Sequence, residues 1–107
     1  MISKDRLEKA LTFISESDEK AAELKTDVER AAYKSKKIKA TLFVHGEGSV
    51  EMRKAGAETA QEAIDADAEY LQAHQDSESL ANKRKTEFLI VDVWRSLNAS
   101  RRQGNIT

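Results

Sequence analysis

The chain has 107 residues, no proline, no cysteine and four glycines, and 35% of its residues are Asp, Glu, Lys or Arg. This length suffices for one domain, and the lack of cysteine excludes a disulfide framework, a thiolate nucleophile and Cys-ligated zinc. Helices carry charge on their outer faces and exclude proline and glycine from their interiors, so the composition predicts an all-α protein. Leu, Ile, Val and Phe number only 22. The predicted core is therefore thin. A partner or a second copy often completes such a core, and we expect a homo-oligomer.

The first predicted element is a helix over residues 3–44, with Ser3 as its N-cap. Two rows of residues at seven-residue spacing form one stripe along it, which is the repeat of a coiled coil. The rows are Leu7, Ile14, Ala21, Val28, Ser35 and Leu42, and Ala10, Ser17, Leu24, Ala31 and Ile38. Many of these side chains are small, so a partner helix can approach closely.

A turn is predicted at residues 45–49, where Gly46 and Gly48 lie close together. Its spacing of glycines is not that of a phosphate-binding loop, and no lysine follows. Ser49 is the predicted N-cap of the next helix.

The second predicted helix covers residues 50–102 and is followed by a flexible tail at 103–107. Its apolar face is mostly alanine, and its predicted large anchors are Ile64, Tyr70 and Leu71. The smaller or flanking members of that face are Val50, Ala57, Ala60 and Ala68. Residues 75–79 are rich in capping side chains, so two alternatives stay open: one long helix, or two helices that break near 75–79.

These elements predict a single domain built as an elongated antiparallel helical hairpin with coiled-coil-like packing. Charge is segregated along the chain: residues 45–79 hold two basic and nine acidic side chains, whereas residues 80–107 hold six basic and two acidic ones. The acidic stretch would lie beside the basic end of the first helix, which supports antiparallel pairing.

Candidates for catalysis or metal binding are few. His74 and Glu78 have helical spacing for a shared ligand, but no second histidine lies near them, and a solvated histidine is the better interpretation. No nucleophile elbow, phosphate loop or Glu-x-x-His motif occurs. We therefore expect no enzyme, and no cofactor or metal ion.

The C-terminal segment is apolar nearly all round from Phe88 to Leu97 and has basic residues on both sides. One interpretation is a helix that its own hairpin and a neighbouring copy bury on two sides. A second is a partner-binding surface anchored by an aromatic residue and flanked by arginine, as interface hot spots often are. Its predicted residues are Phe88, Val91, Trp94, Arg95 and Leu97. A third is an accessory nucleic-acid-binding surface formed by Lys83, Arg84, Lys85, Arg101 and Arg102, although the weakly acidic chain favours it less.

The residues Lys83–Phe88, Val93–Leu97 and Ser100–Asn105 resemble the C-terminus of small helical bacteriophage or prophage proteins of unassigned function. The resemblance covers about a quarter of the chain. It implies a phage-encoded accessory protein, with a host or phage protein as partner or a place in a replication or recombination module. The charged N-terminus lacks the apolar stretch of a signal peptide, and no run is long enough to span a membrane, so we expect a cytoplasmic protein with no membrane partner.

Overall fold

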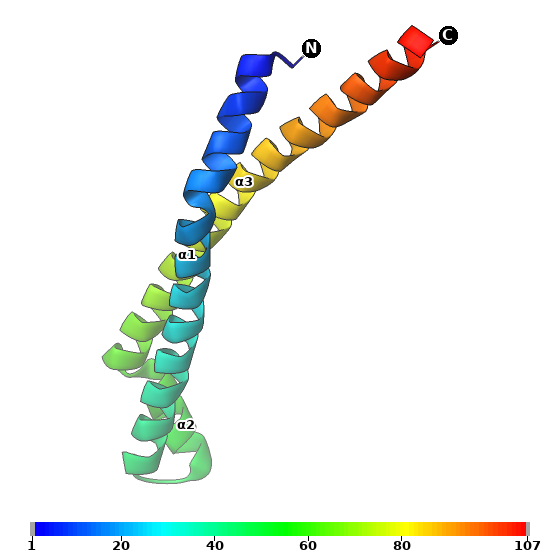
Figure 1. The fold of residues 1–107 in the computed structure, drawn as a ribbon. Coiled ribbons are helices and arrows are strands. Elements are labelled where there is room, and N and C mark those ends of the chain that lie inside the picture. Colours follow the sequence, from blue (N-terminus) through cyan, green and yellow to red (C-terminus); the bar gives the residue numbers. More distant parts are fainter. Residues whose placement is uncertain (1, 107) are drawn as a thin grey trace. The chain divides into compact units, whose positions relative to one another are not determined.

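The computed structural model describes the backbone of residues 2–106 and the side chains of residues 2–102, and this part of the chain contains three helices and no strand. They are α1 (Lys4–His45), α2 (Val50–Thr59) and α3 (Gln61–Ile106), as Figure 1 shows. The all-α prediction is confirmed. The contacts divide the chain into two compact units: unit 1 comprises residues 1–21 and 79–107, and unit 2 comprises residues 22–78.

In each unit, a segment of α1 runs antiparallel to a segment of α3. In unit 1, Arg6 contacts Glu87, whereas Ser17, further along α1, contacts Arg84. In unit 2, Lys34 contacts Glu69 and Lys39 contacts Asp67. Partner numbers on α3 thus fall as those on α1 rise, which confirms the predicted pairing direction in both units.

The heptad predicted for α1 is confirmed, because all eleven of its residues are buried or half-buried. Helix α3 has a matching row of buried and half-buried residues, called its seam, whose members follow at alternating intervals of three and four as in a coiled coil. In unit 2 the seam consists of Ala63, Ala66, Tyr70, Ala73 and Ser77. In unit 1 it consists of Leu80, Arg84, Glu87, Val91, Trp94 and Asn98.

The predicted turn is confirmed, since α1 ends at His45 and α2 begins at Val50. Gly48 has φ of 98°, the left-handed region that favours glycine. The Ser49 side chain accepts a hydrogen bond from the backbone N–H of Met52, which makes it the predicted N-cap. The Arg53 side chain also donates to the Gly48 carbonyl and ties the loop to α2.

The helix after this turn breaks at Ala60, not near residues 75–79, which lie inside α3. Ala60 is extended, with ψ of 142°, and its carbonyl accepts the first hydrogen bonds of α3 from the N–H groups of Ala63 and Ile64. One extended residue shifts the phase of the following helix. The face predicted by continuing from Ala57 to Ile64 and Leu71 is therefore wrong: Ala57 and Ala63 are buried, while Ile64 and Leu71 are 48% and 64% exposed.

The C-terminal end of α3 also differs from the sequence prediction. The tail predicted at residues 103–107 is helical through Ile106, and its side chains and Thr107 lie outside the described residues. The helix therefore runs beyond the predicted end at residue 102.

The thin core predicted from composition is confirmed for the described residues. Its buried apolar members are Ala10, Ala57, Ala63, Ala66 and Val91, and no large side chain is fully buried. Alanine at these positions lets the helices approach closely, because the distance between two helix axes is set by the side chains at the contact. Such a core removes little apolar area from water, and polar contacts along the seams become correspondingly important.

Candidate interaction surface

In unit 1, Val91 and Trp94 face α1. Val91 is 6% exposed and Trp94 is half-buried, and both belong to the seam of α3. Ile2, which precedes α1, lines a small cavity of about 40 Å³ with Trp94 and Leu97. Of the five residues predicted to bind a partner, Val91 and Trp94 therefore pack within unit 1. The other three, Phe88, Arg95 and Leu97, are exposed.

Arg84, predicted as a phosphate contact, lies in the same seam and is bound to α1. Its guanidinium donates hydrogen bonds to the Ile14 carbonyl at 2.8 Å and to the Ser17 hydroxyl at 2.6 Å, and it pairs with Asp18 at 3.2 Å. The Phe88 ring lies 5.7 Å from the guanidinium carbon, within reach of a cation–π contact. Only 13% of the Arg84 side chain is exposed. Its charge is therefore used to hold α3 against α1.

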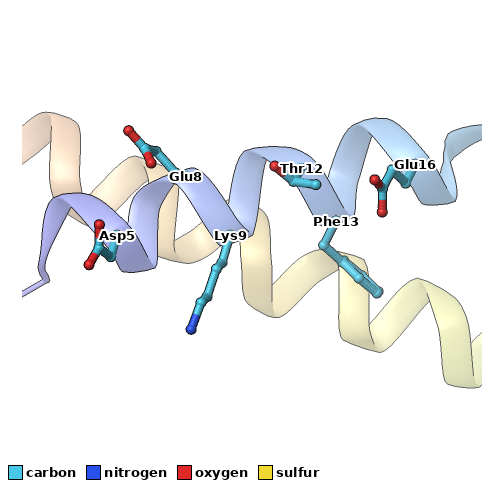
Figure 2. A pocket seen from close by; sticks show the side chains of 6 residues that line it. All are labelled: Asp5, Glu8, Lys9, Thr12, Phe13 and Glu16. Carbon is cyan, nitrogen blue, oxygen red and sulfur yellow. The ribbon is translucent and has the colours of Figure 1, made fainter.

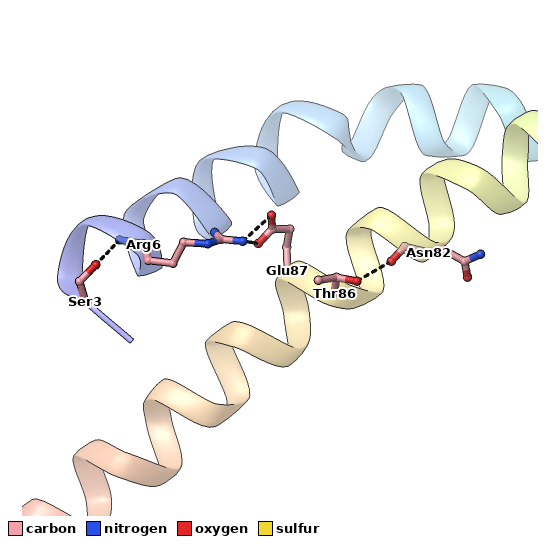
Figure 3. A network of polar contacts seen from close by, with 5 residues as sticks. All are labelled: Ser3, Arg6, Asn82, Thr86 and Glu87. Atoms are coloured by element: carbon pink, nitrogen blue, oxygen red, sulfur yellow. Dashed lines mark hydrogen bonds and ion pairs between the residues drawn. The ribbon is translucent and has the colours of Figure 1, made fainter. Parts of the chain in front are cut away.

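A second ion pair in unit 1 has the same function. Figure 3 shows Arg6 extending from α1 to Glu87, whose carboxylate oxygens accept hydrogen bonds at 2.6 and 2.9 Å. The Ser3 hydroxyl accepts a hydrogen bond from the Arg6 N–H, as the predicted N-cap should. Glu87 is half-buried, so this pair is better shielded from water than a surface pair.

The exposed side of α3 in unit 1 carries a row of apolar residues. Leu89, Val93 and Leu97 are 61%, 40% and 42% exposed and follow one another at intervals of four, so they share one face of the helix. Lys85 precedes the row by one interval and is also exposed, whereas Arg101 lies towards the seam and lines the same cavity as Ile2 and Trp94. Lys85, Leu89, Val93 and Leu97 are called the apolar–basic face. The sequence pattern does not single out Leu89 and Val93, because a segment that is apolar all round does not reveal which side meets the neighbouring helix.

The remaining predicted cations are placed at the surface. Lys83, Lys85, Arg101 and Arg102 are exposed. Unit 1 as a whole has ten basic and seven acidic residues. The excess of positive charge therefore accompanies the exposed apolar row.

Unit 2 presents the opposite character. It has eight basic and twelve acidic residues. On α3, the residues Ile64, Ala68 and Leu71 are exposed and share one side of the helix. Asp65 and Glu78 are also exposed. Asp65 lies beside Ile64, and Glu78 lies two helical turns after Leu71 on the same side of the helix. These five residues are called the apolar–acidic face.

A polar cluster joins α1 and α3 in unit 2. Buried Ser35 donates a hydrogen bond of 2.6 Å to Asp67, and Lys39 pairs with the other carboxylate oxygen at 3.0 Å. The hydrogen bond from Ser35 and the contact with Lys39 lower the pKa of Asp67 below its ordinary value. The cluster thus requires an ionised Asp67 and fixes the position of α3 along α1 in this unit.

The cavity along α1 and the side chain of His74 both lie at the surface. A cavity of about 460 Å³ lies along α1, and in Figure 2 its lining side chains Glu8 and Lys9 point to opposite sides of the helix. It does not direct several polar groups at one point. The His74 ring stacks on Tyr70 at 6.2 Å between centroids. Among the described residues, no group of three or more His, Asp or Glu side chains has the arrangement of a metal site.

Comparison with protein-family models, with curated proteins and with solved structures gives no match to this chain. Within the described residues, no helix is both long and apolar enough to cross a membrane.

Proposed function

We propose that the protein acts by binding rather than by catalysis, and that its apolar–basic face receives an amphipathic helix with acidic flanks. The observation that carries this proposal is the exposure of Leu89, Val93 and Leu97 in one row that begins at Lys85. Contiguous exposed apolar residues rimmed by charge are typical of protein–protein contact sites. The basic excess of unit 1 favours an acidic partner, because opposite charges speed encounter and fix register.

The predicted phage or prophage origin fits an accessory protein of this kind and stays a prediction that rests on the C-terminal resemblance alone. The host or phage protein partner is part of the same proposal. The chemistry of the face specifies only that the partner segment is helical, apolar on one side and acidic at its edges.

A synthetic-peptide titration tests the proposal. The full chain is titrated with a designed helix bearing a leucine stripe and glutamate flanks, and with the same helix bearing lysine flanks, while Trp94 fluorescence is recorded. We expect the glutamate-flanked helix alone to bind, and the double change Leu89→Ser with Val93→Ser to weaken binding at least about tenfold, because two apolar contacts are lost. Tyr33→Ser, at an exposed tyrosine of unit 2, is the control and should leave binding unchanged.

Nucleic-acid binding remains the alternative, favoured by the basic excess of unit 1. It predicts salt-sensitive retention of a DNA oligonucleotide that Lys83→Glu and Arg102→Glu abolish. If neither peptide binds, and such retention is seen, the protein-binding proposal is wrong. If DNA is not retained even at low salt, the alternative is wrong.

A further inference from the structure

The chain itself contains a helical segment with exposed apolar residues and acidic neighbours. The apolar–acidic face of unit 2 has the required features: a helix, exposed apolar residues on one side, and acidic neighbours. Its apolar residues extend from Ile64 to Leu71, about 11 Å at 1.5 Å per residue. The row from Leu89 to Leu97 extends about 12 Å by the same measure. The two rows therefore match in length, and the units that carry them have opposite net charge.

We infer that a second copy of this chain is the occupant, with the apolar–basic face of one copy packed on the apolar–acidic face of the other. This inference rests on the proposed function, since it names the partner of the same face. Every copy offers both faces, so any two copies can form this contact.

Charge argues against the simplest alternative, in which like faces meet. Two copies of unit 1 would bring together surfaces with ten basic and seven acidic residues each, and two copies of unit 2 would bring together surfaces with eight basic and twelve acidic ones. Like charges across a contact are unfavourable. Pairing of unit 1 with unit 2 brings opposite net charges together and is therefore favoured over pairing of like units. Burial of the exposed leucines and isoleucine also supplies the apolar area that the alanine-rich core lacks.

Sedimentation of the full chain tests the inference. Two double variants are compared with the wild type: Leu89→Ser with Val93→Ser, and Ile64→Ser with Leu71→Ser. We expect the wild type to dimerise and each variant to have a dimer dissociation constant raised at least about tenfold. The control Tyr33→Ser with Val44→Ser changes two residues that are exposed outside both faces and should dimerise like the wild type. Circular dichroism of each variant checks that its helices are retained.

Mixing the two weakened variants distinguishes unlike from like pairing. Each variant keeps the face that the other has lost, so the mixture has one intact contact and should dimerise more strongly than either variant alone. If the Ile64→Ser, Leu71→Ser variant dimerises as well as the wild type, like faces of unit 1 meet and the inference is wrong. A monomeric wild type that still binds the glutamate-flanked helix also overturns the inference, while leaving the proposed function intact.

Discussion

Replacing Arg84 by alanine tests how the polar seam of unit 1 contributes to stability. The change removes two hydrogen bonds to α1, at the Ile14 carbonyl and the Ser17 hydroxyl, together with the ion pair to Asp18. It also removes the apolar stem of a side chain that is only 13% exposed.

The magnitude follows from these contacts. Loss of two buried methylene groups costs about 1.6 kcal/mol. A hydrogen bond from a charged donor that is shielded from water contributes about 1.5–3 kcal/mol. Part of this loss is offset, because alanine also removes the cost of burying the guanidinium charge. Asp18 is 81% exposed, so its ion pair contributes little. The Ile14 carbonyl keeps its helical N–H partner and is not left unsatisfied. We therefore expect Arg84→Ala to lower the free energy of unfolding by about 3 kcal/mol.

Arg84→Met separates packing from polar contacts, because methionine keeps much of the stem and carries no charge. We expect it to lose about half as much as alanine. Urea unfolding is followed by the fluorescence of Trp94, the single tryptophan, which lies in unit 1, and by circular dichroism. Lys83→Ala changes an exposed neighbour of Arg84 and is the control. It should shift the free energy of unfolding by no more than about 0.5 kcal/mol. A loss below about 1 kcal/mol for Arg84→Ala, or equal losses for alanine and methionine, would show that the contacts of Arg84 with α1 do not stabilise unit 1 as described.

Three further predictions concern unit 2. The pKa of Asp67 is lowered from 3.8 in the folded state, so its contribution is complete above that value and is lost as pH falls through the lower folded pKa. Asp67→Asn should flatten the acid limb of the stability curve, and an unchanged limb contradicts this. Gly48→Ala should cost about 1 kcal/mol, because φ is 98°, and a thermal midpoint equal to the wild type counts against it. Ala63→Leu should lower the free energy of unfolding by about 2 kcal/mol, because Ala63 is buried and leucine would overpack the contact. Ala81→Leu, at an exposed position, is the control and should not lower it. Equal thermal midpoints for the two variants would contradict this packing.

The sequence alone determined those parts of the fold that depend on local chemistry. The heptad of α1 is readable because its apolar and small residues alternate with charged ones. The turn at 45–49 is readable because Gly48 and the capping residue Ser49 act on their immediate neighbours. Helical composition and the thin core follow from residue counts.

The phase of α3, and with it the candidate surface, depends on how α3 packs against α1. No proline or glycine marks Ala60, yet its extended conformation rotates Ile64 and Leu71 out of the core. In unit 1, Val91 faces α1 and Val93 faces solvent, although both lie in one apolar run. Arg84 was indistinguishable from its basic neighbours until Ile14 and Ser17 of α1 were placed beside it. An amphipathic pattern orients a helix only where its faces differ, and where they do not, the neighbouring helix selects the buried side.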